Sequence, residues 1–288
     1  MEIFGIDTSS LAPCQVAPDL DRRFGGLVRL YGALGAKRIR NAHIVVVGLG
    51  GVGSWAVEAA ARSGVGRLTL IDFDHIAESN INRQVHATES TLGQSKVQAM
   101  QERIAGINPH CQVDCIEEFA SRENWPDILP SGLRLEPDHF AVIDACDQVK
   151  AKTEMAAWAI HNKINLVSVG AAGGKRLAHR VEIDDLSAVT HDPLLAQLRN
   201  RLRKEKSIAR LGKMNLVCVF SREPVLQRTV SSAPITQNTG VDAIPMPDIS
   251  VPIQTDGSLN CHGYGSVVSV TATFGMCATS WVLNKIAS

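Results

Sequence analysis

The stretch from His43 to Arg62 limits the possible folds of this chain more than any other. Residues 44–47 are all β-branched and apolar, which is typical of a strand buried on both faces. The turn Gly48-Leu-Gly-Gly-Val-Gly53 follows directly, and a run of good helix formers then reaches Arg62, shortly before Gly64. Strand, glycine turn and helix in this order predict the first unit of a doubly wound, Rossmann-like α/β fold.

The glycines of this turn predict a place for a polyphosphate. Gly48 permits the tight turn, Gly50 and Gly51 allow the backbone to approach a ligand closely, and Gly53 lets the helix pack against the strand. The N-terminus of the helix offers unpaired N–H groups and a partial positive charge to an anion. Glycine turns also join elements that bind nothing, so it is the strand before and the helix after that favour nucleotide binding.

The rest of the chain predicts a mainly parallel sheet with helices between its strands. Strands are expected at 67–74, 111–116, 140–144, 164–169 and 215–221, with an antiparallel extension at 180–183, and helices at 21–40, 93–107, 150–163 and 192–206. The segment 267–286 has the length of a membrane span. However, it contains several serines and threonines, so we interpret it as a C-terminal helix that packs inside the protein.

Composition excludes several classes of protein. The net charge is zero, so global charge gives no reason to expect a polyanionic partner. The seven cysteines form no Cys-x-x-Cys pair, and an odd number at irregular spacing is no disulfide framework. Together with an N-terminus that has no secretory signal pattern, this predicts reduced thiols in a cytoplasmic protein, with membrane association not expected.

Polar residues after the second strand indicate which nucleotide is bound. Asp72 lies about twenty positions beyond the glycine turn, where a doubly wound fold holds ribose hydroxyls. A nicotinamide-dependent dehydrogenase fits equally well up to this point. The dense polar segment Glu78–Gln84 favours a triphosphate instead, because a triphosphate needs donors along its length. Lys96 lies in the first turn of a helix, where a cation is disfavoured unless it reaches toward an anion; an exposed lysine is the alternative.

Four motifs now stand in order: Gly48–Gly53, Asp72–Asp74, Ser79–Gln84 and Leu92–Lys96. Together they resemble the adenylation domain of ubiquitin-activating enzymes and of their bacterial relatives ThiF and MoeB, over roughly residues 20–185. The resemblance implies that Asp72 holds the ribose of ATP, that Arg83 helps to expel pyrophosphate, and that Lys96 contacts the phosphates. The ATP-binding positions it implies are Gly48, Gly50, Gly51, Gly53, Asp72, Asp74, Ser79, Asn80, Asn82, Arg83, Gln84 and Lys96.

The strand at 140–144 ends in Asp144-Ala-Cys-Asp147, and an acidic residue at this end of a parallel strand faces the ligand crevice. The same resemblance places Asp147 at a magnesium-associated aspartate, with Asp144 behind it. Carboxylate oxygen suits Mg²⁺ that is shared with phosphates. Asp147 could also cap the helix that starts near Val149, and the two roles are compatible.

The organisation we predict has three parts in one globule. Residues 1–20 form an irregular arm, residues 21–185 an ATP-binding adenylation domain, and residues 186–288 an extension with a basic helix, a long loop at 222–260 and the packing helix. The basic helix is either a solvated surface or a contact for a nucleic-acid backbone. The residues expected to make that contact are Arg199, Arg201, Arg203, Lys204 and Lys206.

Two departures separate the chain from the sulfur-carrier activators. First, it has no cysteine pairs for a zinc site. Second, Gly26 stands at the position where those enzymes carry a second N-terminal arginine, so Arg22 or Arg29 would have to replace that arginine. These departures and the segments 23–32, 192–195 and 270–275 make nearly the whole chain similar to one branch of the family, the tRNA threonylcarbamoyladenosine dehydratases.

That branch implies an activity, a substrate and partners. The activity is ATP-dependent cyclisation of threonylcarbamoyladenosine in tRNA through an acyl-adenylate, with Arg83, Lys96 and Asp147 as catalytic residues. The partners are tRNA and a second copy of the chain. Cys261 falls where the branch has a cysteine proposed to accept sulfur from a desulfurase, but cyclisation needs no thiol and we favour a structural role. The alternative function is activation of a ubiquitin-like or sulfur-carrier protein.

Overall fold

A single seven-stranded sheet forms the centre of the structure, a computed structural model that describes residues 18–133, 135–136, 138–208, 211–225 and 264–288. The strand order is β3-β2-β1-β4-β5-β7-β6, and every pair is parallel except β6 and β7. The strands are β1 (His43–Val47), β2 (Arg67–Ile71), β3 (Gln112–Ile116), β4 (Phe140–Asp144), β5 (Asn165–Val169), β6 (Val181–Asp185) and β7 (Val217–Ser221). The predicted fold class, a mainly parallel sheet with an antiparallel extension, is confirmed.

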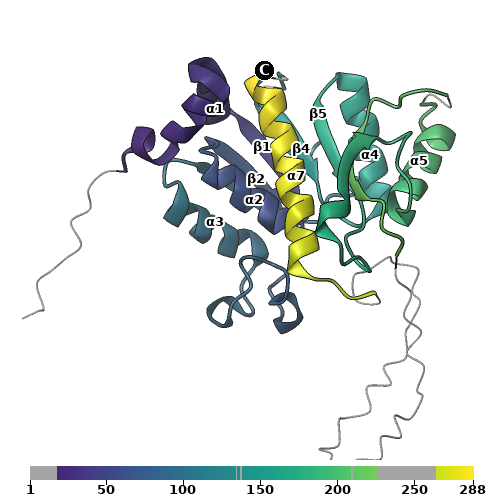
Figure 1. The fold of residues 1–288 in the computed structure, drawn as a ribbon, viewed down its shortest axis with the longest axis horizontal. Coiled ribbons are helices and arrows are strands. Elements are labelled where there is room, and N and C mark those ends of the chain that lie inside the picture. The colour runs from purple at the N-terminus through teal and green to yellow at the C-terminus, as the bar shows by residue number, and fades with distance from the viewer. Residues whose placement is uncertain (1–17, 134, 137, 209–210, 226–263) are drawn as a thin grey trace, which may run out of the picture.

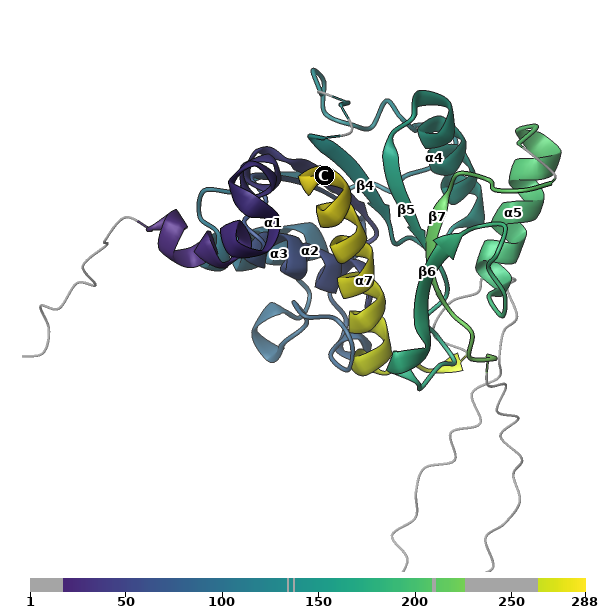
Figure 2. The same cartoon turned by 45° about the horizontal axis from the view of Figure 1, so that its top comes forward.

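Helices cover both faces of this sheet (Figures 1 and 2). The helices are α1 (Leu20–Asn41), α2 (Gly53–Arg62), α3 (Lys96–Ile107), α4 (Val149–Asn162), α5 (Pro193–Glu205) and α7 (Val268–Ala287). Side chains of β1 alternate between the two layers. Ile44 and Val46 pack with α1, α2, α3 and α7, whereas Val45 and Val47 pack with α4 and α5. Burial on both faces explains why this strand is an unbroken apolar run.

The C-terminal helix α7 lies against α2 beside the glycine turn, as Figure 1 shows. The two helices approach so closely that a Cβ on Gly275 would stand 2.4 Å from the carbonyl oxygen of Val52. The hydroxyl of Thr279 donates to the carbonyl oxygen of Ala56 at 3.0 Å. The predicted packing helix is therefore confirmed. In the part of the chain that the structure describes, no helix is long and apolar enough to span a membrane.

The helix α1 lies at the amino edge of the sheet. Arg23 donates to the carbonyl oxygen of Ile107 at the end of α3, and the ring of Phe24 lies against Gly64 just past the end of α2. The helix bends at Gly32, whose φ of 72° is left-handed. Residues 1–17 of the predicted arm lie outside the described residues.

The boundary predicted after residue 185 stays a prediction. Strand β6 ends at Asp185, and β7, which follows that boundary, lies between β5 and β6. Both sides of the boundary therefore contribute strands to one sheet. Most of the predicted loop at 222–260 lies outside the described residues.

Candidate active site

A pocket of about 490 Å³ opens at the carboxyl edge of the parallel strands. It lies where the chain leaves β1 on one side and β4 on the other, which is the point where a doubly wound sheet binds ligands. Most of the residues implied by the sequence line it, namely Gly48, Gly50, Gly51, Asp72, Asp74, Ser79, Asn80, Arg83, Gln84, Lys96 and Asp147. Two do not: Gly53 lies beneath the turn, and Asn82 lines a neighbouring hollow.

The glycines of the turn have different structural roles. Gly48 has a φ of +86°, and its N–H donates to the carbonyl oxygen of Ile71 at 2.9 Å. A Cβ on Gly53 would lie 1.7 Å from the carbonyl oxygen of Gly48, so no other residue fits there without a shift of backbone. A Cβ on Gly50 would meet no atom within 4 Å. Gly48 and Gly53 therefore shape the turn, and Gly50 leaves space in the pocket.

Asp72 joins the end of β2 to the glycine turn. Its carboxylate accepts the N–H of Leu49 at 2.5 Å and the N–H of Asp74 at 2.9 Å. The side chain is almost completely buried, and burial raises its pKa while the nearby Lys96 opposes the rise. Each carboxylate oxygen keeps a lone pair for a further donor such as a ribose hydroxyl.

Lys96 is the first residue of α3 and is only 5 % exposed, so the interpretation as an exposed lysine is wrong. Its Nζ lies 2.7 Å from Oδ2 of Asp74 and 3.8 Å from Oδ1 of Asp72. Two carboxylates thus hold the ammonium at the pocket wall, in the position of the helix where the dipole alone would disfavour it. An ammonium has three N–H donors, so at least one remains for an oxygen of a ligand.

Arg83 is held at the rim by neutral groups. Its Nη1 donates to the carbonyl oxygen of Ser79 at 2.7 Å and to the side-chain oxygen of Asn82 at 3.0 Å. The backbone oxygen of Arg83 accepts from the indole of Trp55 at 2.9 Å. The amide of Asn82 in turn donates to the carbonyl oxygen of Ser266. None of these partners is a carboxylate, so the positive charge of Arg83 remains available to phosphate.

Gln84 and Asn80 are buried polar residues of the same segment. The side-chain oxygen of Asn80 accepts the N–H of Ala77 at 3.1 Å and so holds the short 3-10 helix Glu78–Asn80. Gln84 is 5 % exposed, and its Oε1 has no hydrogen-bond partner among the described residues. Because a buried amide without a partner costs free energy, Gln84 is a good candidate to bind a ligand.

The two aspartates after β4 have different environments. Asp144 is fully buried and accepts from Lys152 Nζ at 2.9 Å and from Ser168 Oγ at 2.7 Å, and its place behind a metal-bound Asp147 stays a prediction. Asp147 is exposed and lines the pocket. The interpretation of Asp147 as a helix cap is wrong, because the N-cap residue of α4 is Gln148.

Phe119 is a pocket residue that the sequence analysis missed. It is 48 % exposed, and its ring lies 5.1 Å from that of Phe73, which directly follows Asp72. The available signal was the position of Phe119 just beyond β3, at the same edge as the other strand ends. Gly170, Leu194 and Thr271 also line the pocket, and the last two lie in the segments 192–195 and 270–275 that carried the resemblance to the dehydratases.

Thiols in the described residues have the environment of structural cysteines. Burial raises the pKa of Cys111 to about 12, and burial together with neighbouring carboxylates raises the pKa of Cys115 to about 11. Cys146 lines the pocket, and burial raises its pKa as well. Raised pKa values keep these thiols protonated and unreactive. Cys261 lies outside the described residues.

The basic helix α5 is largely tied to the protein itself. Arg199 donates to the carbonyl oxygens of Leu186 and Val189, at 3.1 and 2.9 Å. Arg201 pairs with Glu205 and Lys206 with Glu154, and Arg203 is half-buried. Lys204 is exposed and forms no ion pair with the described residues. Contact of this helix with nucleic acid stays a prediction.

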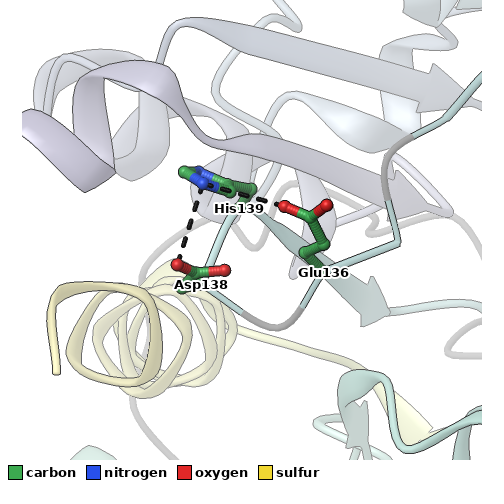
Figure 3. Close-up of side chains that lie close together, drawn as sticks. All are labelled: Glu136, Asp138 and His139. Atoms are coloured by element: carbon green, nitrogen blue, oxygen red, sulfur yellow. Dashed lines mark ion pairs between the residues drawn. The ribbon is translucent and has the colours of Figure 1, made fainter.

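A separate group of titratable side chains lies at the opposite edge of the sheet, just before β4. Figure 3 shows His139 between Asp138 and Glu136, with its Nε2 3.7 Å and 3.9 Å from their carboxylate oxygens. The side chains of all three are accessible to solvent. Exposed acidic groups of this kind gather commonly without a bound ion, so we assign no metal to them.

Fold and site together define a nucleotide-binding α/β protein of the doubly wound class. The sequence matches the ThiF family over residues 23–286, and the chain belongs to that family. The tRNA threonylcarbamoyladenosine dehydratase of Haemophilus influenzae is 41 % identical over 92 % of this chain and 94 % of its own length, and that of Escherichia coli is 38 % identical over 92 % and 93 %. A crystal structure of the E. coli dehydratase, TcdA, in complex with ATP superposes with a TM-score of 0.76 at 36 % identity, covering 94 % of this chain and 96 % of that one.

Proposed function

We propose that this chain catalyses the ATP-dependent cyclisation of threonylcarbamoyladenosine in tRNA. The observation that carries the proposal is the match over nearly the full length of both chains to dehydratases of this name, one of which was crystallised with ATP. The pocket supports it, because the glycine turn, Asp72, Arg83 and Lys96 come together at one edge of the sheet.

The reaction has two steps in this proposal. The threonyl carboxylate attacks the α-phosphorus of ATP, and pyrophosphate leaves. The ureido oxygen of the same side chain then attacks the activated acyl carbon, AMP leaves, and the ureido nitrogen gives up a proton, so the nucleoside loses the elements of water. The second step is intramolecular, and proximity supplies much of its rate. The protein contributes position and positive charge, for which Arg83 and Lys96 are placed in the pocket.

Asp147 is the residue we propose to hold Mg²⁺ with the phosphates. Magnesium binds through one or two carboxylates and otherwise through water and substrate oxygens. Asp147 lines the pocket and is exposed, and it takes part in no hydrogen bond or ion pair with the described residues. Asp144 cannot serve in the same way because Lys152 and Ser168 occupy its carboxylate. Bound magnesium would neutralise phosphate charge.

We also propose a homodimer, with α1 and α7 forming the contact. Leu30 and Leu34 lie on either side of the bend of α1 at Gly32 and are 73 % and 64 % exposed, and Met276 on the neighbouring helix α7 is 41 % exposed. Apolar side chains that gather on two adjacent helices favour burial against a partner. Arg22 and Arg29 of the same helix α1 do not line the pocket of the chain to which they belong.

The desulfurase partner implied by Cys261 is not needed for cyclisation.

The test is nucleoside mass spectrometry of tRNA carrying threonylcarbamoyladenosine, after incubation with the protein, ATP and Mg²⁺. We expect a nucleoside lighter by one water, together with one AMP per product. Lys96→Met is the control, since it removes the ammonium from the pocket wall. AMP formation that depends on a small Gly-Gly-ended protein, with tRNA left unchanged, would instead establish the alternative function, activation of a ubiquitin-like or sulfur-carrier protein.

A further inference from the structure

The helix α2 holds the segment that carries Arg83 as well as the glycine turn. Trp55 is the third residue of α2, and its indole N–H donates to the backbone oxygen of Arg83 at 2.9 Å. The hydroxyl of Ser54, one position earlier, accepts the N–H of Val85 at 3.4 Å. The helix itself begins at Gly53 of the turn. The glycine turn and the segment around Arg83 therefore share one support.

The side chain of Arg83 lies directly on the glycine turn. A Cβ on Gly51 would stand 3.1 Å from Cγ and 3.2 Å from Cδ of Arg83, so the stem of the arginine rests on bare backbone there. The guanidinium is fastened beyond the turn, to the carbonyl oxygen of Ser79 and to the side chain of Asn82. Because the backbone, the stem and the guanidinium of Arg83 each have a contact, its charge has a defined place in the pocket wall.

Asn82 connects this arrangement with the start of α7. Its Oδ1 accepts from Arg83, and its Nδ2 donates to the carbonyl oxygen of Ser266, just before α7, at 3.0 Å. The helix α7 also packs on Trp55, since a Cβ on Gly275 would stand 3.1 Å from the Cβ of Trp55. The two supports of Arg83 are therefore joined to each other through α7.

Trp55 is half-buried and does not line the pocket, so it reaches a bound nucleotide only through Arg83. In the adenylation step the bond between the α-phosphorus and its bridging oxygen breaks, and negative charge develops on the leaving pyrophosphate. A fixed cation stabilises developing charge only from the correct place. A misplacement of about 1 Å can cost about a hundredfold in rate. The position of Arg83 therefore matters as much as its charge.

We propose that Trp55 is a positioning residue, which places Arg83 for the departure of pyrophosphate. Its indole N–H fixes the backbone of Arg83 to α2, and the contact between Asn82 and Ser266 holds the neighbouring side chain from α7. The inference rests on the proposed function, because pyrophosphate leaves only in the adenylation step. Trp55 supplies neither a charge nor a proton to the reaction and acts through Arg83 alone.

The first test is Trp55→Phe, which keeps an aromatic ring and removes the N–H group. We expect the Kd for ATP, measured by calorimetry, to rise at least about threefold. The kcat for AMP formation should fall at least about tenfold. The Kd for AMP should change less than about twofold, because AMP lacks the two phosphates that leave. Trp281→Phe is the matched control, since Trp281 is also half-buried but has its ring beside Lys285, near the end of α7.

The second test removes the donor without changing the shape of the ring system. Benzothienylalanine at position 55 keeps two fused rings and carries sulfur in place of the N–H group, so the packing against α7 is retained. We expect the same losses as in Trp55→Phe. A double-mutant cycle with Arg83→Met then assigns the effect. Once the guanidinium is absent, Trp55→Phe should change the Kd for ATP less than about 1.5-fold.

The outcomes separate a positioning role from a role in the fold alone. Equal weakening of ATP and AMP binding, or the same effect of Trp55→Phe with and without Arg83→Met, overturns the inference. An unchanged Kd for ATP together with an unchanged kcat in both Trp55 variants overturns it as well. Wild-type protein that makes no cyclic nucleoside would instead overturn the proposed function, and the binding cycle still tests the contact between Trp55 and Arg83.

Discussion

Two glycine-to-alanine substitutions in the same turn are predicted to change different properties. Gly53→Ala should lower stability, whereas Gly50→Ala should weaken ATP binding. In Gly53→Ala the new Cβ would lie 1.7 Å from the carbonyl oxygen of Gly48. Both atoms are fixed to the backbone, so no side chain can rotate away and the turn or the start of α2 must move. Overpacking of this kind costs about 3 kcal/mol. For a chain of 288 residues the unfolding entropy is about 0.6 kcal/mol/K, so this cost corresponds to a fall in Tm of about 5 °C.

In Gly50→Ala the new methyl group meets no atom within 4 Å, and the backbone is not left-handed. We expect stability to change by no more than about 0.5 kcal/mol. The methyl group projects into space that a phosphate would fill, so the Kd for ATP should rise at least about tenfold, or about 1.4 kcal/mol.

The assay is thermal unfolding of wild type and both variants, with and without ATP and Mg²⁺. We expect Gly53→Ala to unfold early under both conditions. Gly50→Ala should unfold at the wild-type temperature without ligand and lose the stabilisation that ATP gives. A Gly50→Ala protein with the full ATP-dependent shift would refute our reading of the turn, as would a Gly53→Ala protein of wild-type stability.

Three further predictions concern other parts of the molecule. Burial, with Lys96 and Arg103, lowers the pKa of His86 to about 4, so stability should decrease as the pH falls from about 6.5 toward 4. In His86→Leu the slope of the free energy of unfolding against pH, measured by urea unfolding, should be smaller by up to about 1.4 kcal/mol per pH unit. An unchanged slope would contradict this prediction. Lys152→Met leaves the buried carboxylate of Asp144 without its cationic partner and should lower the free energy of unfolding, measured in urea, by about 3–5 kcal/mol. A decrease of less than about 1 kcal/mol would contradict this prediction. If the exposed Lys204 contacts tRNA, Lys204→Ala should reduce the salt slope of tRNA binding by about 0.9.

The sequence predicted the strands and the glycine turn because their signals are local. An apolar β-branched run followed by glycine and helix formers needs no distant partner to be recognised. Residues at the ends of parallel strands could also be placed together, since these ends share one edge of the sheet. Asp72 and Asp147 were located in the pocket for this reason.

Other roles were decided by contacts that no spacing encodes. Trp55 reaches Arg83, Asn82 reaches Ser266, and the ring of Phe119 meets that of Phe73, each across a long separation in sequence. Lys96 looked equally suited to solvent until the structure placed it between two carboxylates. A side chain's partner depends on strand order and helix packing.

The sequence by itself therefore determined the fold class and the position of a nucleotide pocket, because periodicity and turn chemistry act over a few residues. Only the tertiary structure decided which charges are buried, which cations are already paired, and how Arg83 is held beside the glycine turn. These properties depend on the summed packing of α2, α3 and α7, segments that lie far apart in the chain and meet only in the folded protein.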